Sequence, residues 1–206
     1  MSVEKFDKSA FTYDQNPMHV ERGIAVANAI KKLVPIKKDW VIADFGCGTG
    51  LLGINFVNDV KKIVMIDASQ NMLKVLKEKL DKLKIENVEI LKFDITKDQN
   101  LPNLRFDLIV TLMTFHHIND IKSALNKLFS MIKKDGYLAL ADLDEEDGSF
   151  HKDKETVHNG INQTKLRDYA KEIGFEFVKS DIPYVIKRDI DGQLKEYPVF
   201  LHIYCK

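Results

Sequence analysis

The chain has 206 residues, of which 45% are hydrophobic, and this size suits one globular domain with a substantial core. Its 31 lysine and arginine residues balance 31 aspartate and glutamate residues, so the net charge gives no general reason to bind nucleic acid or an anionic membrane. A local basic patch is compatible with this balance. Because the overall charge does not favour nucleic acid, we expect a small molecule as the partner.

The pattern of apolar segments and the two cysteines indicate the cellular location that we expect. No stretch approaches 18 uncharged apolar residues, and residues 1–11 lack the apolar core of a signal peptide. Cys47 and Cys205 are the two cysteines, which by themselves make neither a disulfide framework nor a zinc site. We expect a cytoplasmic protein without membrane insertion, either a monomer or a homodimer, with both thiols reduced and buried.

Apolar runs alternate with amphipathic stretches between residues 20 and 142, which is typical of a parallel sheet covered by helices. The expected strands are residues 40–45, 62–67, 88–93, 106–112 and 136–142. The expected helices are residues 20–34, 50–58, 71–83 and 120–132. Ser69 can cap the third of these helices, whose apolar residues recur at helical spacing.

The C-terminal third has a different pattern. After a polar loop, a helix is expected at residues 164–173, closed by Gly174. Two long runs follow, joined through Asp191 and Gly192, a dipeptide that favours a tight hairpin turn. The last two strands should therefore be antiparallel neighbours.

Residues 41–50 read VIADFGCGTG, a buried strand that runs into three glycines at alternate positions. Gly48, Gly50 and Gly53 also spell GxGxxG, and Asp67 ends the next strand, where an acid can hold both hydroxyls of a ribose. Glycines at this place let the backbone turn sharply and approach a ligand closely. The alternative is a tight turn between strand and helix without any ligand.

Asp44 helps to decide between a ligand with a pyrophosphate and a ligand with positive charge at this loop. A carboxylate beside the loop would repel a pyrophosphate, whereas it suits a ligand with positive charge. S-adenosylmethionine offers a ribose for Asp67, a cationic sulfonium and an α-ammonium group, and it carries no phosphate. This one ligand explains both acids and the glycines.

Five motifs together resemble a known family. They are DFGCGTG at residues 44–50, VMID at 64–67, FDI at 93–95, FDLIV at 106–110 with FHHI at 115–118, and KDGY at 134–137. They resemble class I S-adenosylmethionine-dependent methyltransferases, and they look closest to the small members grouped with ubiquinone and menaquinone biosynthesis methyltransferases. One departure is Asp135-Gly136, where many relatives have two glycines; it falls in a surface turn away from the site.

The resemblance implies an α/β fold, with a single Rossmann-like doubly wound sheet of seven strands, the last strand antiparallel, and helices on both faces. It implies one methyltransferase domain over residues 1–206, in which residues 1–19 are a candidate lid. It also implies that Asp94 meets the adenine amino group, that Ile95 and Met72 line the adenine, and that backbone near Met113 faces the methionine moiety. The expected cofactor-binding residues are Asp44, Gly46, Cys47, Gly48, Gly50, Asp67, Ala68, Met72, Asp94, Ile95 and Met113.

His116 and His117 follow the fourth strand, at the carboxyl edge where open α/β sheets bind ligands. Adjacent residues there point in different directions, so at most one should face the methyl acceptor. That imidazole is the candidate catalytic base, needed if the acceptor must lose a proton. A positioning or purely structural role is the alternative.

Residues 139–160 and the N-terminal segment supply the remaining candidates. Asp142, His151 and His158 are expected at the rim of an acceptor pocket, although acids and histidines in a loop are usually just solvated. Their spacing matches no metal motif, and we expect no metal. Tyr13 is expected near the cofactor and the acceptor because an aromatic residue ahead of the first helix can close over a ligand. Alternatively it anchors that helix.

Two other functions are compatible with part of this pattern. A nicotinamide-dependent oxidoreductase could use the GxGxxG loop, but Asp44 argues against it, and no Tyr-x3-Lys pair is present to deliver a proton. The second alternative function is that of a nonenzymatic module, which holds the nucleotide and binds a protein. The acceptor itself is not specified, beyond the expectation of a quinone-like, phenolic or other small metabolite.

Overall fold

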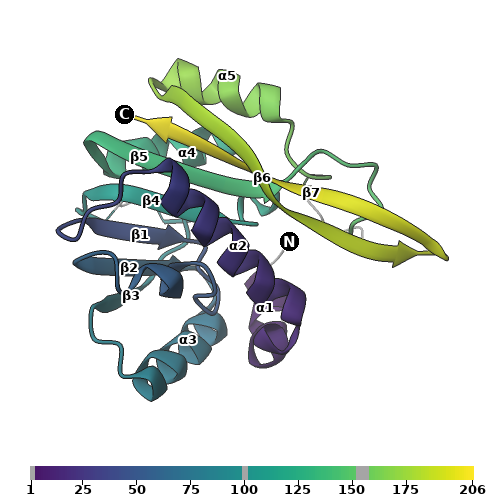
Figure 1. Ribbon diagram of the computed structural model, residues 1–206, viewed down its shortest axis with the longest axis horizontal. Coiled ribbons are helices and arrows are strands. Elements are labelled where there is room, and N and C mark those ends of the chain that lie inside the picture. Colours follow the sequence, from purple (N-terminus) through teal and green to yellow (C-terminus); the bar gives the residue numbers. More distant parts are fainter. Residues whose placement is uncertain (1–2, 99–101, 152–157) are drawn as a thin grey trace.

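The computed structural model describes residues 3–98, 102–151 and 158–206, and its centre is one seven-stranded sheet (Figure 1). The strand order is β3-β2-β1-β4-β5-β7-β6. Neighbours from β3 to β5 are parallel, whereas β7 is antiparallel to both β5 and β6. The strands are β1 Val41–Phe45, β2 Lys62–Asp67, β3 Val88–Lys92, β4 Phe106–Leu112, β5 Ile132–Leu143, β6 Glu176–Ile190 and β7 Gln193–Cys205.

Helices cover both faces of this sheet. The α-helices are α1 Val3–Ser9, α2 Pro17–Leu33, α3 Gln70–Leu83, α4 Ile121–Met131 and α5 Gln163–Ile173. The 3-10 turns are η1 Ala10–Gln15, η2 Gly53–Phe56 and η3 Phe115–His117. The expected Rossmann-like sheet, with its last strand antiparallel and helices on both faces, is thus confirmed.

The core consists of two apolar layers because alternate strand residues point to opposite faces of the sheet. In β1, Ile42 packs in the layer under α2 and α3, and Ala43 packs in the layer under α4 and α5. Val110 and Ile109 of β4 divide in the same way. These strands are buried on both faces, which explains why they appear in the sequence as continuous apolar runs.

The helix expected near residues 50–58 is wrong, since only the 3-10 turn η2 forms there. Gly50 has φ +83°, which is incompatible with a right-handed helix. The Asn55 side chain also donates to the carbonyls of Leu51 and Leu52 at 2.8 and 3.1 Å, and so competes with a helical hydrogen-bond ladder. The helix at α3 begins as expected, because Ser69 Oγ accepts the Met72 amide at 3.2 Å.

The C-terminal hairpin turns at Asp191 and Gly192, whose φ values are +53° and +82°. Positive φ at both positions matches the turn that best fits the twist of two antiparallel strands. The hairpin tip extends beyond the other strands of the sheet (Figure 1). Strand β6 forms one edge of the sheet, and much of its length is exposed.

The N-terminal segment, which comprises α1 and η1, lies against α3 (Figure 1). Asp7 Oδ1 accepts hydrogen bonds from Ser69 Oγ at 2.5 Å and from the Asn71 amide at 3.0 Å. Asp14 pairs with Lys79 at 2.7 Å and accepts from Thr49 Oγ1 at 2.5 Å. Residues that look separable in the sequence are therefore tied to the edge of the sheet where the parallel strands end.

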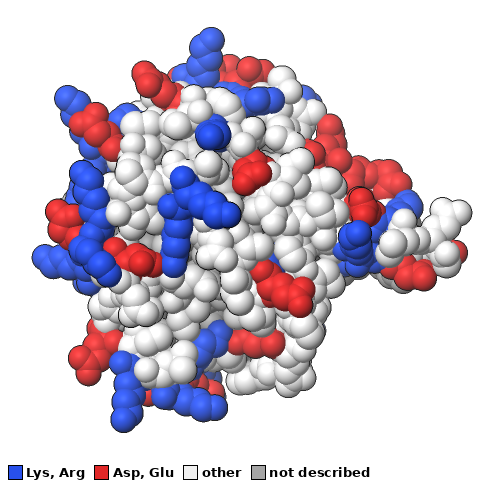
Figure 2. Space-filling view, viewed as in Figure 1, with Lys and Arg blue, Asp and Glu red and all other residues white. Residues whose placement is uncertain are grey.

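Charged side chains of both signs are interspersed on the face that Figure 2 shows, with uncharged surface between them. Among the described residues, no helix is long and apolar enough to cross a membrane.

Candidate active site

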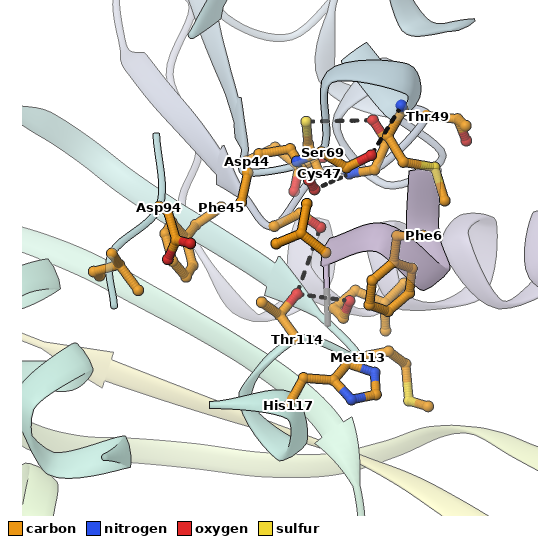
Figure 3. A pocket seen from close by; sticks show the side chains of 18 of the residues that line it. Phe6, Asp44, Phe45, Cys47, Thr49, Ser69, Asp94, Met113, Thr114 and His117 are labelled. Atoms are coloured by element: carbon orange, nitrogen blue, oxygen red, sulfur yellow. Dashed lines mark hydrogen bonds between the residues drawn. The ribbon is translucent and has the colours of Figure 1, made fainter. Parts of the chain in front are cut away.

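A cavity of about 400 Å³ lies at the carboxyl ends of β1, β2 and β4 (Figure 3). The strand order reverses direction between β1 and β4, and such a switch point is where open α/β sheets form a ligand crevice. The loops after these strands form one wall, and residues of α1, η1 and α2 form the other. The volume is in the range of pockets that enclose small molecules and cofactors.

The three glycines of the loop after β1 have positive φ values of +69°, +54° and +83° for Gly46, Gly48 and Gly50. A side chain at Gly46 would collide with Thr114, and one at Gly50 would come within 2.6 Å of Leu76. At Gly48, by contrast, an added Cβ would meet only Met72 Sδ at 3.9 Å. Gly46 and Gly50 thus permit close packing of the protein, whereas Gly48 leaves space in the cavity.

Asp67 ends β2 and holds the glycine loop with both carboxylate oxygens. Oδ2 accepts the Gly48 amide at 2.7 Å, and Oδ1 accepts the Ser69 amide at 2.8 Å. Burial raises the pKa of Asp67, although these amide hydrogen bonds oppose the shift. Each oxygen retains acceptor capacity toward the cavity, because a carboxylate oxygen accepts more than one hydrogen bond.

Asp44 is 1% exposed, and its Oδ2 accepts the Gly53 amide at 2.8 Å. Burial raises its pKa to about 7, and the charge of Asp67 adds to the shift against the opposing hydrogen bond from Gly53. A fully buried and a partly buried carboxylate, Asp44 and Asp67, therefore lie near each other on adjacent parallel strands. A positive ligand charge in the cavity would stabilise the ionised form of Asp44.

Arg22 of α2 lines the cavity opposite the strand ends and was missed in the sequence. It is 5% exposed, and its buried Nε has no hydrogen-bond partner among the described residues. A sequence signal existed, because Arg22, Val26 and Ile30 lie one helical turn apart on the buried stripe of α2. A cation on an apolar stripe suggests a ligand with an anionic group.

Tyr13 also lines the cavity, on the same side as Arg22. Burial raises the pKa of its hydroxyl, and the nearby guanidinium of Arg22 partly opposes this shift. Its ring packs on His19, with centroids 4.2 Å apart. The residue thus both contributes to the cavity wall and anchors the start of α2, so the two expected roles are compatible.

Asp94, Ile95 and Met72 form another part of the lining, and Figure 3 shows Asp94 and His117 on opposite sides of the pocket. Asp94 Oδ1 accepts from the amide and the hydroxyl of Thr96 at 2.9 and 2.6 Å. Burial opposes its ionisation, but these hydrogen bonds and the Lys97 charge together lower its pKa. Cys47 and Ala68 also line the cavity, and burial raises the pKa of the Cys47 thiol.

The loop after β4 starts with Met113 at φ +56°, an unusual conformation for a residue with a side chain. Asp142 of β5 anchors this loop, since its Oδ2 accepts the amides of Thr114 and Phe115 at 3.1 and 2.7 Å. Its Oδ1 accepts the Leu143 amide at 2.7 Å and also bonds Nδ1 of His116. Asp142 is fully buried and lies behind the cavity wall, so the expectation of a rim position for it is corrected.

His116 and His117 point in different directions. His116 is 1% exposed and is held by Asp142, whereas His117 lines the cavity near Met113 (Figure 3). Burial, assisted by the neighbouring His116 and His151, lowers the pKa of His117 to about 2. A base with so low a pKa accepts a proton poorly at neutral pH.

His151 and His158 are separated by the structure. His151 has its ring centroid 5.4 Å from His116 and 5.7 Å from His117, so it joins them in one cluster. His158 Nε2 instead contacts the carbonyl of Ile118 at 3.0 Å, behind the cavity lining. Within the described ranges, no group of three histidine, cysteine, aspartate or glutamate residues is arranged to hold a metal ion.

Comparison with known proteins identifies the family. Residues 36–194 match the methyltransferase domain family. The chain belongs to this family. An uncharacterized methyltransferase of Schizosaccharomyces pombe is 36% identical over 121 residues, which are 56% of this chain and 43% of that protein. The chain therefore spans less than half the length of that relative.

Two further similarities agree with this family. The ubiquinone/menaquinone biosynthesis C-methyltransferase of Campylobacter jejuni is 29% identical over 163 residues, 72% of this chain and 66% of that protein. The crystal structure of a SAM dependent methyltransferase from Aquifex aeolicus has the same fold, with a TM-score of 0.68, 21% identity and 98% coverage of both chains. The resemblance to S-adenosylmethionine-dependent methyltransferases is confirmed, and S-adenosylmethionine is the cofactor of this domain class.

The anchoring role of Asp142 predicts a large loss of stability in Asp142→Asn. The substituted amide would present N–H donors to the backbone amides that now donate to a carboxylate, so the free energy of unfolding should fall by about 2–4 kcal/mol. Asp144→Asn is the matched control, because the Asp144 carboxylate accepts, among the described residues, only the amide of its neighbour Glu145, at 3.0 Å, and the residue lies partly exposed. Denaturant unfolding measures both variants. Equal stability of the two would show that Asp142 does not anchor the loop.

Proposed function

We propose that the protein transfers a methyl group from S-adenosylmethionine to a small-molecule acceptor. The observation that carries this proposal is the pair of buried opposite charges, Asp44 and Arg22, that line the same cavity as Asp67. An α-amino acid zwitterion needs one anion and one cation, and a ribose needs an acceptor for its hydroxyls. S-adenosylmethionine carries both groups in one molecule.

The residues present fit this cofactor in chemical type. Asp67 supplies acceptors for ribose hydroxyls, and Gly48 leaves room for close approach of the ligand. Asp44 provides negative charge for the ammonium and sulfonium groups, and Arg22 provides positive charge for the carboxylate. Asp94, Ile95 and Met72 would hold the adenine on the side of the cavity opposite His117.

Bound S-adenosylmethionine supplies a methyl group already activated on a sulfonium, so the chain needs mainly to align an acceptor and exclude water. Met113 and Thr114 fix the wall between the glycine loop and His117. Phe6 packs edge-on against the His117 ring, with centroids 5.2 Å apart, and narrows that part of the cavity. We assign the acceptor to this side, beyond the residues that would hold ribose and adenine.

A small-molecule acceptor is favoured over a nucleic acid. The charges are balanced in the sequence and interspersed on the visible surface (Figure 2), so they provide no continuous basic field for a phosphate backbone. The Campylobacter jejuni relative is named for ubiquinone and menaquinone biosynthesis, which is consistent with a quinone-like or phenolic acceptor. An oxidoreductase is disfavoured, because a buried Asp44 near the loop would repel a pyrophosphate.

Equilibrium binding and product formation test the function together. The protein should bind S-adenosylhomocysteine in the micromolar range and should not bind NAD, and labelled S-adenosylmethionine should transfer its label to a component of a metabolite extract. Binding without transfer to any acceptor would favour the nonenzymatic module. NAD binding with no S-adenosylhomocysteine binding would refute the proposal.

Gly48→Val should abolish S-adenosylhomocysteine binding, because its side chain would occupy the cavity. Gly192→Val is the matched control: Gly192 also has positive φ, at +82°, and nothing lies within 4 Å of an added Cβ there. Both variants incur backbone strain of about 1–3 kcal/mol, but the control should retain affinity. Isothermal titration calorimetry compares them, and equal affinities would mean that Gly48 serves only the turn.

The affinity for S-adenosylmethionine should depend on Asp44 ionisation. The carboxyl has a pKa of about 7 and binds a cation only when ionised, so affinity should fall as pH decreases below 7, by up to about tenfold per pH unit. Asp44→Asn should bind more weakly and lose this slope between pH 8 and pH 5.5. A slope that persists in the variant would assign the titration to another group.

A further inference from the structure

We infer that an excess carboxyl group in the cavity, that of Asp44, makes the protein select the charged methyl donor over its neutral product. S-adenosylmethionine carries a sulfonium, whereas S-adenosylhomocysteine, which remains after the transfer, carries an uncharged thioether. The two molecules otherwise share their ammonium, carboxylate, ribose and adenine groups. This inference rests on the proposed function and assigns to the same site a preference between donor and product.

Several ionisable side chains of the cavity lining are predominantly uncharged at neutral pH. Burial raises the pKa of the Tyr13 hydroxyl and of the Cys47 thiol. Burial also lowers the pKa of the imidazoles of His19 and His117. The charge of the cavity therefore depends on the other ionisable residues of the lining.

The lining charges of Asp94, Lys97 and Glu4 need no counter-charge from a ligand. Asp94 forms an ion pair with Lys97, with 3.5 Å between Oδ2 and Nζ. Glu4 lies exposed in the first turn of α1, where water and salt screen its charge. These residues leave the charge balance in the inner part of the cavity unchanged.

The inner part of the lining holds two carboxyl groups and one cation. Asp44 is 1% exposed, Asp67 is partly buried, and Arg22 is 5% exposed. No ion pair of these three residues occurs in the described part of the chain. The charged groups behind the lining are the ion pair of Asp14 with Lys79, the carboxylate of Asp7 and the pair of Asp142 with His116. The lining therefore provides one carboxyl group more than it provides cations.

The methyl donor balances this charge, and the product does not. The carboxylate of either ligand would neutralise Arg22, and the ligand ammonium would neutralise one of the two carboxyl groups. The sulfonium of S-adenosylmethionine neutralises the other. With S-adenosylhomocysteine this last cation is missing, so one ionised carboxyl group would stay in the cavity without a counter-charge, which is costly.

The transfer itself removes the charge that the cavity requires. The bond between sulfur and the methyl carbon breaks, and its electron pair stays on sulfur, while the methyl carbon forms a bond to the acceptor. The positive charge passes to the methylated acceptor or leaves it as a proton. Once the acceptor has departed, the remaining thioether shares the cavity with an unbalanced carboxylate and should dissociate more readily than the donor.

Asp44 is the carboxyl group whose ionisation depends most on that cation. Its side chain accepts one backbone amide, that of Gly53, at 2.8 Å, whereas Asp67 accepts the amides of Gly48 and Ser69. Burial raises the pKa of Asp44 to about 7, and Asp67 is the charged group that adds to this shift. Without a sulfonium, Asp44 is therefore the group that takes up a proton near neutral pH.

Sinefungin is a suitable probe, because it carries a protonated amino group at the position of the methylsulfonium and cannot transfer a methyl group. At pH 8 it should bind at least about tenfold more tightly than S-adenosylhomocysteine, since a nearby opposite charge stabilises a carboxylate by about 1–3 pKa units. Calorimetric titration measures both affinities. Titration of the groups that the two ligands share cancels in the ratio.

The pH dependence of this ratio tests the role of Asp44 without a substitution. A pKa of about 7 means that Asp44 is mostly ionised at pH 8 and mostly protonated at pH 6. The preference for sinefungin should therefore fall by about tenfold between pH 8 and pH 6. Sinefungin binding at pH 7 should also release more protons than S-adenosylhomocysteine binding, as measured in buffers of different ionisation enthalpy.

A pair of variants separates Asp44 from general charge effects. Asp44→Asn should reduce the preference for sinefungin to within about twofold and abolish its pH dependence, because the excess carboxyl group is gone. Glu4→Gln is the matched control: it removes the same charge from the lining of the same cavity, but at an exposed position. Its preference should stay within about twofold of that of the unmodified protein.

The possible failures are distinguishable. If sinefungin and S-adenosylhomocysteine bind the unmodified protein equally, or if the preference persists in Asp44→Asn, the selection by Asp44 is refuted while the cofactor site stands. A loss of preference in Glu4→Gln would contradict it as well. If the unmodified protein binds neither ligand, the proposed function itself fails.

Discussion

Two neighbouring carboxyl groups, Asp44 fully buried and Asp67 partly buried, are the constraint on which the site depends. Asp44 and Asp67 end neighbouring parallel strands, and the ionisation of each is opposed by burial. The chain offsets part of this cost with amide donors from Gly48, Gly53 and Ser69. The backbone path of the glycine loop, residues 46–53, places the Gly48 and Gly53 amides within hydrogen-bond distance of the two carboxylates. A cationic ligand would offset the remainder.

A third carboxylate organises the other half of the cavity. Asp142 joins β5 to the loop after β4, and it holds His116 through the same group that caps η3. The position of His117 in the cavity wall is therefore set by a residue that does not line the cavity. The site thus combines two loops on a rigid sheet with one buried anchor, which is how precise geometry is usually maintained.

Much of the sheet could be predicted from the sequence, because strands buried on both faces appear as apolar runs with clear ends. The bounds of β2 and β4 were predicted correctly, and so was the turn at Asp191 and Gly192. The helix at residues 50–58 was wrong, since its composition looked helical while Gly50 had to take positive φ for the loop. Helix propensity does not reveal that a particular glycine must adopt a positive φ in the folded loop.

Residues of the cavity could be predicted from the sequence where a motif and the residue's own chemistry indicate its place. Residues whose importance depends on their neighbours in the fold could not. Asp44, Gly48 and Asp67 line the cavity as expected. Arg22 was missed because a single cation in an amphipathic helix is common, and its significance depends on its burial at the cavity, which only the fold shows. Asp142 was placed at a rim because strand ends often carry site residues, whereas its role depends on amides that only the folded loop presents.

The hydrogen bonds of Asp7 and Asp14 have a kinetic consequence. They fasten α1 and η1 to Ser69, Asn71, Thr49 and Lys79, close to the residues that form the opposite wall of the cavity. A molecule that leaves past this segment must wait until these bonds break together. The frequency of that detachment sets an upper limit on the number of catalytic cycles per second through this exit, however fast the chemical step is.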